Sequence, residues 1–354
     1  MLSYISAKEA AEKWNISQRR VSTLCSEKRI EGAMMIGNMW IIPDNAEKPQ
    51  DKRLTKTIEN NLPLKPFVKW VGGKGQLVDK LSKFITSDTE HLPKKYCEPM
   101  VGGGALFFNV LSNYKFEQFY ISDINCELIN AYNIIKYNVE ELIKILNEMQ
   151  ILYLSMDENG RKFYYYSIRN KFNLLQIDES TRIEKAAYFI FLNKTCFNGL
   201  YRVNKKGQFN VPMGSYKNPT ICDEENLRNV SAALQNVTIV CGDYMLSKSF
   251  IDKDTFVYID PPYRPISQTS GFTSYNTDTF DDNAQLRLAK YFDEISAVGA
   301  KAVLSNSDPK NINPDDNFFD NLYCRYNIKR ICASRSINSK KEKRGKISEL
   351  IIYN

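Results

Sequence analysis

Short apolar runs alternate with helical patterns over most of the chain. Runs rich in β-branched and aromatic residues are typical of strands, whereas apolar residues spaced three and four apart indicate helices. This alternation predicts an α/β sheet that binds its ligands at the carboxyl ends of its strands. The expected strands are 96–98, 119–122, 237–241, 255–259 and 300–305, and the expected helices among them are 105–111 and 126–138.

Composition narrows the class of protein. No apolar run in the 354 residues is long enough to span a membrane, and the N-terminus lacks a secretory signal, so a cytoplasmic protein is expected. His91 is the only histidine, which argues against His-rich metal sites and Ser-His-Asp hydrolases, and no metal is expected. None of the eight cysteines are spaced C-x-x-C, so reduced, mostly buried thiols are expected.

The positive charge is concentrated in two segments. The net charge is +7, yet residues 201–217 alone carry +4 and residues 335–346 carry +5. Such focusing indicates a polyanion held at two places, although a basic run can also be a plain solvated face.

The first 48 residues have the pattern of a small separate module. Ser6 and Glu9 form a capping box at the start of one helix, and Ser17 caps a second. Two short strands, 33–36 and 39–42, follow and meet at Gly37-Asn38. This order is that of a winged helix-turn-helix, whose second helix would present Arg19 and Arg20 to DNA.

The module also resembles the small helix-turn-helix units of the MerR and excisionase type. The alternative is a helical hairpin that packs on a neighbour or binds protein. Residues 49–66 are polar and contain prolines, which is typical of a linker. The remaining residues, 67–354, are expected to form one catalytic domain with an insertion at about 140–235.

A glycine-rich turn indicates a nucleoside site. Glu98 ends a predicted strand and is followed by Gly102, Gly103 and Gly104, where a ligand can approach the backbone. Asp123 ends the next strand 21 residues after Gly102, the spacing of an acid that binds ribose hydroxyls. Without a third glycine of the dinucleotide fingerprint, an adenosyl ligand lacking phosphates fits better.

Two further residues end another predicted strand. Asp243 and the ring of Tyr244 are candidates to bind the adenine of that ligand through its amino group and its ring face. Acids at strand ends are also common without such a role.

The sequence Asp260-Pro261-Pro262-Tyr263 follows the apolar run 255–259. The prolines fix the backbone, so the Asp260 carboxylate and the Pro261 carbonyl can accept both N–H bonds of an exocyclic base amine. They would also stabilise the positive charge that the amine gains when it is alkylated. Tyr263 would stack on the base after it has been flipped from the duplex.

These motifs resemble, in order, those of the Dam-like, D12-class DNA adenine-N6 methyltransferases of the α group. The resemblance runs from Phe67 to about Tyr353, and it includes Phe67 to Lys74, Asn198 to Arg202 and Gly207 to Gly214. It implies a Rossmann-like methyltransferase sheet, S-adenosyl-L-methionine as cofactor, and cofactor contacts from Trp70, Lys74 and Asp123. It also places Asp260 next to both the cofactor and the target amine.

The insertion is then expected to recognise double-stranded DNA, and the C-terminal basic segment to hold its backbone. The sequence GATC is the expected target, a cognate restriction endonuclease is a candidate partner, and a monomer is expected.

Three alternatives keep the methyltransferase fold but change the substrate to cytosine N4, RNA or a glutamine amide. A fourth is a transcription regulator whose body only senses the cofactor. The expected DNA contacts outside the first module are Arg202, Lys205, Lys206, Gln208, Asn210, Tyr216, Lys217, Arg335, Lys340 and Lys341.

Overall fold

The computed structural model divides into two compact units, Met1–Asn61 and Leu62–Asn354. Each unit is described by itself. The structure describes residues 4–14, 18–26, 30, 32–37, 39–44, 46, 64–70, 72, 78–85, 92–264, 280–334 and 346–354.

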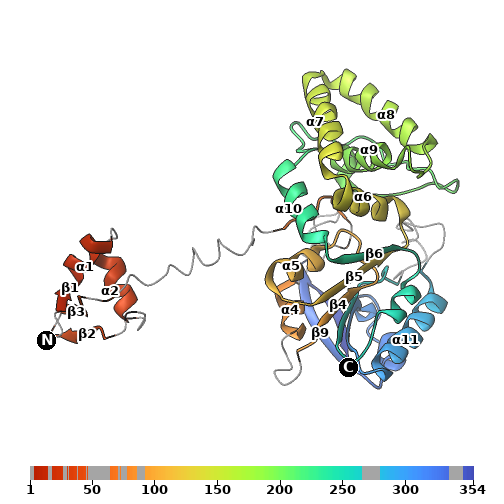
Figure 1. Ribbon diagram of the computed structural model, residues 1–354. Coiled ribbons are helices and arrows are strands. Elements are labelled where there is room, and N and C mark those ends of the chain that lie inside the picture. The colour runs from red at the N-terminus through yellow and green to blue at the C-terminus, as the bar shows by residue number, and fades with distance from the viewer. Residues whose placement is uncertain are drawn as a thin grey trace. The chain divides into compact units, whose positions relative to one another are not determined.

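The N-terminal unit (red in Figure 1) is a pair of short helices with a three-stranded antiparallel sheet of order β1-β3-β2. Its two predicted helices and its hairpin are confirmed, whereas strand β1 was not predicted. Its elements are β1 (Tyr4–Ser6), α1 (Ala7–Trp14), α2 (Gln18–Ser26), β2 (Met34–Ile36) and β3 (Met39–Pro43).

The predicted capping box begins α1. The Glu9 carboxylate accepts hydrogen bonds from both the backbone N–H and the hydroxyl of Ser6, each at 2.8 Å, and the Glu9 N–H returns one to the Ser6 hydroxyl. Burial of the predicted inner face is also confirmed. The buried side chains of the two helices include Ala10, Ala11, Trp14, Val21, Leu24 and Cys25.

The second unit is built on a seven-stranded sheet of order β6-β5-β4-β7-β8-β10-β9. All five predicted strands are confirmed to within two residues at each end. The strands are β4 (Lys95–Glu98), β5 (Gln118–Asp123), β6 (Val237–Cys241), β7 (Thr255–Ile259), β8 (Lys301–Ser307), β9 (Asn327–Ser334) and β10 (Lys346–Tyr353).

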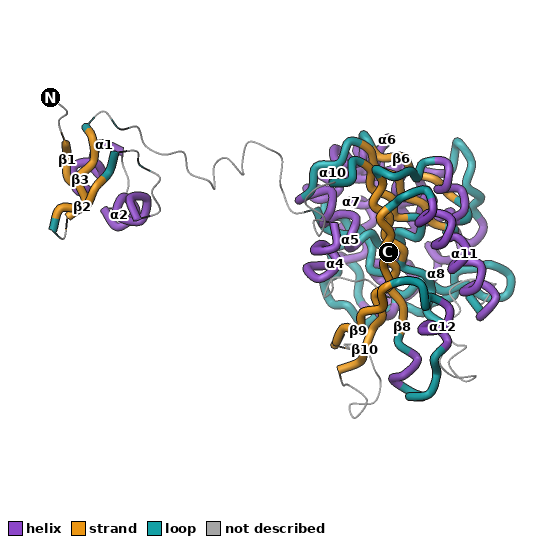
Figure 2. The backbone as a smooth tube through the Cα atoms, turned by 90° about the horizontal axis from the view of Figure 1, so that it is seen from below, coloured by secondary structure: helices purple, strands orange, loops and turns teal. Residues whose placement is uncertain are grey.

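Strands β6, β5, β4, β7 and β8 are parallel, so their carboxyl ends lie at one edge of the sheet. Strand β10 runs antiparallel between β8 and β9 (Figure 2). The chain proceeds outward from β4 to β5 and β6, then returns to the other side of β4 as β7. A ligand is expected at this reversal between β4 and β7.

Helices cover both faces of the sheet. Larger ones are α4 (Val78–Ile85), α5 (Ala105–Asn113), α6 (Cys126–Tyr137), α7 (Val139–Ser155), α8 (Glu158–Leu174), α9 (Arg182–Thr195), α10 (Glu224–Leu234) and α11 (Asp282–Ala297). Shorter ones are η1 (Phe197–Gly199), η2 (Tyr244–Ser249), η4 (Pro309–Asn311) and α12 (Phe318–Leu322). Among the described residues, no helix is both long and apolar enough to cross a bilayer.

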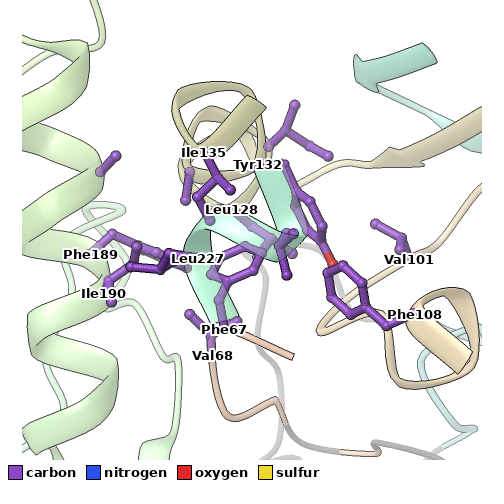
Figure 3. Close-up of a cluster of buried hydrophobic side chains, with 14 of the residues drawn as sticks. Phe67, Val68, Val101, Phe108, Leu128, Tyr132, Ile135, Phe189, Ile190 and Leu227 are labelled. Carbon is purple, nitrogen blue, oxygen red and sulfur yellow. The ribbon is translucent and has the colours of Figure 1, made fainter. Parts of the chain in front are cut away.

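Alternate residues of each strand enter two separate cores, as a pleated strand buried on both faces requires. Phe256 and Tyr258 pack into the core under α5 and α6, whereas Val257 and Ile259 pack into the core under α11. Figure 3 shows part of the first core, where the Phe67 ring meets Tyr132 of α6 edge-on at 4.7 Å.

Helices α7, α8 and α9 lie together at one end of this unit, beyond α6 (Figure 1). Helix α9 packs on α6, α7 and α8, and its buried face includes Phe189 and Ile190 (Figure 3). In the chain these helices fall between β5 and β6, where the insertion was expected.

The expectation of reduced cysteines is wrong at one pair. Cys126, at the start of α6, forms a disulfide with Cys241, at the end of β6. The sequence hid this pair because 115 residues separate the two cysteines, and only the pairing of β5 with β6 brings them together. Four other thiols are free and buried, those of Cys25, Cys97, Cys196 and Cys222, whereas the free thiol of Cys324 is exposed.

Candidate active site

Four carboxyl groups lie along the carboxyl edge of the parallel strands. Glu98 ends β4, Asp123 ends β5, Asp243 follows β6 and Asp260 follows β7. These four strands are neighbours in the sheet, so the four residues lie along one edge although Glu98 and Asp260 are far apart in sequence.

The glycine loop after β4 is packed too closely for side chains. Gly102 and Gly104 have positive φ angles of 50° and 70°, which favour glycine. A Cβ atom on Gly102 would lie 2.8 Å from Cδ1 of Trp70, and one on Gly104 would lie 2.6 Å from the Tyr132 hydroxyl. The loop therefore brings the indole of Trp70 directly against the backbone.

Trp70 is also stacked on a second ring. Its indole and the ring of Tyr201 lie 5.6 Å apart with an interplanar angle of 22°. Tyr201 belongs to the segment that follows α9, so Trp70 joins the glycine loop to that segment. The sequence placed Trp70 at the cofactor site but did not indicate this second role.

Asp123 ties the glycine loop to the next strand. Its Oδ2 accepts a hydrogen bond from the Gly102 N–H and its Oδ1 one from the Asn125 N–H, both at 2.9 Å. Burial raises the pKa of Asp123, although these backbone donors act to lower it. Because a carboxylate has about four lone-pair sites, Asp123 can still accept from a ligand hydroxyl.

Glu98 is almost fully buried, with 3% of its surface exposed. Burial raises the pKa of Glu98 well above its ordinary value, and the nearby Asp260 carboxylate raises it further. The Tyr96 hydroxyl donates a hydrogen bond of 2.7 Å to Glu98 and acts in the opposite direction. Glu98 is thus a buried carboxyl group beside Asp260, and its burial favours the neutral form.

Asp243 has partners within the protein. Both of its oxygens accept hydrogen bonds from the Arg287 guanidinium, at 2.7 and 3.0 Å, and its Oδ1 also caps η2. Burial acts to raise the pKa of Asp243, but Arg287 and the Met245 N–H outweigh it and hold that pKa below its ordinary value.

The expectation that the Tyr244 ring offers an open face is not met. Tyr244 is 5% exposed, packs edge-on against Tyr291 and lies under the Arg287 guanidinium. The reason is local, because Asp243 caps η2 and turns the next side chain into the core.

A short hydrogen-bond chain holds Asp260. The Ser305 hydroxyl donates to Asp260 Oδ1 at 3.0 Å, and the same hydroxyl lies 2.9 Å from the hydroxyl of Tyr258. Ser305 is fully buried on β8, the next parallel strand. Sequence analysis placed Ser305 on a strand but could not tell that it faces this carboxylate.

The rest of the tetrapeptide is supported from two other elements. Gln285, buried on α11, donates a hydrogen bond of 3.4 Å to the Pro262 carbonyl. The Tyr263 hydroxyl donates one of 3.0 Å to Glu349 Oε2 on β10. These two contacts and Ser305 act on three of the four residues, so neighbouring elements fix the tetrapeptide.

Arg264 anchors the chain immediately after the tetrapeptide. Its guanidinium binds both oxygens of Asp282, at 2.6 and 3.0 Å, and one oxygen of Asp316 at 2.8 Å. It also lies 4.2 Å from the centre of the Phe318 ring. Two separate segments, the start of α11 and residues 316–318, therefore hold Arg264 directly after the tetrapeptide.

The basic segment 201–217 forms a small hairpin. Val203 and Phe209 form an antiparallel bridge, and Gly207 has a φ of 73° in the turn. The side chains of Lys205 and Lys206 are exposed near the tip of this hairpin.

Several polar side chains of the hairpin bond to each other. Arg202 Nε donates to Asn210 Oδ1 at 2.7 Å, and Asn204 donates to Gln208 Oε1 at 3.1 Å. Arg202 and Gln208 remain exposed.

Beyond the hairpin, the Lys69 amino group lies 3.9 Å from the centre of the Tyr216 ring. The side chain of the neighbouring Lys217 is exposed, and its carbonyl accepts a hydrogen bond from Arg161.

The sequence analysis did not select one exposed aromatic residue beside the hairpin as a candidate. Phe197 is 51% exposed although it is a large apolar side chain. Its N–H donates to the Pro212 carbonyl, and the next residue, Asn198, has a φ of 54°. The available signal was the Phe197-Asn198-Gly199 turn, which starts the segment that resembles a DNA-contacting region.

Some expected site residues lie outside the described residues. These are Lys74, Arg335, Lys340 and Lys341. Arg19 and Arg20 belong to α2, but their side chains lie outside the part of the chain that the structure describes.

Comparison with known proteins identifies the family. The family of D12 class N6 adenine-specific DNA methyltransferases matches residues 70–337. The chain belongs to this family. The match excludes the N-terminal unit and decides for adenine in DNA over cytosine N4, RNA or a glutamine amide.

Curated relatives agree over most of their length. Type II methyltransferase M.MjaIII of Methanocaldococcus jannaschii is 48% identical over 293 residues, which cover 82% of this chain and 99% of the relative. Type II methyltransferase M1.LlaDCHI of Lactococcus lactis subsp. cremoris is 38% identical, with coverages of 84% and 97%. A DNA adenine methylase of Haemophilus influenzae is 36% identical, with coverages of 84% and 96%. The methyltransferase unit thus corresponds to nearly the whole of each relative.

Proposed function

We propose that this adenine-specific methyltransferase acts on an adenine flipped out of duplex DNA, at the edge where Asp260 to Tyr263 follow β7. The observation that carries the proposal is the support of the tetrapeptide by Ser305, Gln285 and Glu349. A base inside a duplex could not reach a carboxylate and a ring that are held at the end of a buried strand.

The residues at this edge fit S-adenosylmethionine, which supplies an activated methyl group when bound. The glycine loop packs directly on the Trp70 indole, and the carboxyl oxygens along this edge suit the hydroxyls and the ammonium of such a ligand. Asp243 would receive the adenine amino group in place of one hydrogen bond from Arg287. The proposed cofactor-binding residues are Trp70, Lys74, Glu98, Gly102, Gly104, Asp123, Asp243 and Asp260, with Tyr244 supporting Asp243 from the core.

Each residue of the tetrapeptide has a separate task. Asp260 and the Pro261 carbonyl accept the two N–H bonds of the adenine amine and orient its lone pair. Asp260 also stabilises the positive charge that develops on the nitrogen. Tyr263 stacks on the extruded base, which keeps the base in place while the hydrogen bonds form.

The hairpin and its flanks would hold the DNA. Arg202, Lys205, Lys206 and Lys217 are exposed and suited to phosphates, while Gln208 has an exposed amide suited to base edges. Asn210 and Tyr216 are engaged within the protein, so their proposed roles are to orient Arg202 and Lys69. Arg335, Lys340 and Lys341 are proposed to bind the backbone.

Phe197 is the best-placed wedge for the gap that flipping leaves. Replacement of Phe197 by alanine is expected to lower single-turnover methylation about tenfold, because an apolar wedge offsets a few kcal/mol of unstacking. With 2-aminopurine at the target position, the fluorescence increase on binding should shrink correspondingly.

A matched control is Phe163→Ala, which removes a ring that is 79% exposed on α8. It should leave both the rate and the fluorescence unchanged. Equal losses in the two variants would show that any exposed ring stabilises the complex and would contradict the wedge role of Phe197.

The N-terminal unit is proposed to be a winged helix-turn-helix that places α2, with Arg19 and Arg20, in the major groove. The buried inner faces of its two helices and its exposed strand β2 support this proposal. The proposed target sequence of the methyltransferase is GATC, in a cytoplasmic monomer that acts alone or with a restriction endonuclease.

Methylation mapping tests the proposed function directly. Plasmid DNA from a methylase-free host that expresses this chain should carry N6-methyladenine at one motif, and DNA from the Asp260→Ala variant should carry far less. An unmodified plasmid from both strains would refute the proposal, and modification outside GATC would refute only the target.

A further inference from the structure

The proposed stacking residue is held by a carboxyl group distant in sequence. The Tyr263 hydroxyl donates a hydrogen bond of 3.0 Å to Glu349 Oε2, and 86 residues separate the two. Both side chains are half-buried at this contact. A tyrosine that only filled space would not need an acceptor placed at the end of its ring.

Glu349 lies on a strand whose position is well fixed. It pairs with Ser307 of β8 on one side and with Ile331 of β9 on the other. The side chain of Asn311 binds the backbone of the preceding residue, Ser348. Its amide nitrogen donates to the Ser348 carbonyl at 2.7 Å, and its Oδ1 accepts from the Ser348 N–H at 2.9 Å. The backbone of Glu349, whose carboxyl oxygen accepts the hydrogen bond from the Tyr263 hydroxyl, is therefore fixed by its neighbours.

We propose that Glu349 is a positioning residue for methyl transfer, acting through Tyr263. This inference rests on the proposed function, in which the Tyr263 ring stacks on the flipped adenine. The hydrogen bond fixes the rotation of the ring, so its face is already aligned when the base arrives. Alignment before binding removes an entropic cost from the step in which the amine attacks.

The same bond acts on the charge of the ring. A phenol that donates to a carboxyl oxygen becomes richer in electrons, and this increases the negative potential of its face. The adenine gains positive charge as its amine is methylated, so an electron-rich face stabilises the transition state more than the ground state. Glu349 is thus expected to affect the rate of transfer more than the affinity for DNA.

A double-mutant cycle tests this role. Tyr263→Phe and Glu349→Ala should each lower the single-turnover rate about tenfold, since each removes the same charge-assisted hydrogen bond. The double variant should be no slower than either single variant, because the bond can be lost only once. Glu349→Gln keeps an acceptor oxygen at the same place and should recover part of the rate. The dissociation constant for DNA should stay within about twofold in all four variants.

Two measurements separate positioning from a structural role. The thermal midpoint and the emission of 2-aminopurine at the target site report folding and base flipping in each variant. Ser348→Ala, on the neighbouring position of β10, is the matched control for damage to the strand and should retain the full rate.

The role of Glu349 would be overturned if the rate reductions of the two single variants multiplied in the double variant, or if Ser348→Ala lowered the rate as much as Glu349→Ala. Either result would leave the proposed function intact. A wild-type protein that transfers no methyl group to DNA would overturn both.

Discussion

Replacing Asp260 by alanine is expected to reduce single-turnover methyl transfer by about 100- to 1,000-fold, the usual loss when one electrostatic contact to a developing charge is removed. The substrate amine would lose a hydrogen-bond acceptor and a negative charge together. The fold is expected to survive, because Asp260 follows the last residue of β7 and its side chain is half-buried rather than part of the core. Rapid-quench assays with radiolabelled cofactor and saturating DNA measure this loss.

Asp260→Asn separates the two contributions. Asparagine keeps an oxygen that can accept from Ser305 and from the substrate amine but carries no charge. If charge stabilisation dominates, this variant should be nearly as slow as Asp260→Ala. If orientation of the amine dominates, asparagine should recover much of the rate.

Asp252→Asn is the matched control, since Asp252 lies at the other end of β7 and pairs with Lys95 at 2.7 Å. Its rate should equal that of the wild type. An Asp260→Ala variant within about threefold of the wild type would contradict the role assigned to this carboxylate.

The sequence predicted the five parallel strands because each is a short apolar run, whereas the antiparallel strands β9 and β10 were not predicted. Asp123 and Asp260 were found for the same reason, since each directly follows such a run. Their place at the same edge of the sheet also followed, because parallel strands share one carboxyl edge. These predictions used only local patterns together with one general rule of α/β folds.

The residues that support the site could not be found in this way. Ser305 and Glu349 act through contacts between strands that are far apart in sequence, and the order β7-β8-β10 must be known before either can be placed. Arg287 is one charged residue among several on α11, and nothing local marks it as the partner of Asp243. Phe197 was missed because an exposed ring has no periodic pattern.

The disulfide is the largest departure from the sequence-based expectation, and its loss should have the largest effect on stability. Cys126→Ser is expected to lower the free energy of unfolding by about 2 to 5 kcal/mol, because the bridge closes a loop of more than a hundred residues. Urea denaturation of the catalytic unit in the full chain measures the difference. Dithiothreitol should move the wild type to the midpoint of the variant and leave the variant unchanged.

The same bridge lies between two parts of the proposed cofactor site. Cys126 follows Asp123 by three residues, Cys241 precedes Asp243 by two, and the Gly242 N–H donates to the Asp123 carbonyl at 3.0 Å. Loosening this junction should weaken cofactor binding as well as the fold. A several-fold rise in the dissociation constant of S-adenosylmethionine is therefore expected in Cys126→Ser and in the reduced wild type.

Cys324→Ser is the control for this experiment, because it removes an exposed free thiol at another place in the same unit. It should keep the wild-type midpoint and the wild-type response to dithiothreitol. Thiol titration of denatured, unreduced wild type should find at least two thiols fewer than the eight cysteines of the chain. Cys126 is exposed and Cys241 is half-buried, so reductant can reach the bridge in the folded protein. If all eight thiols titrate without reduction, or if dithiothreitol leaves the midpoint unchanged, the bridge does not stabilise this protein, and the packing of β5 on β6 must hold the cofactor site alone.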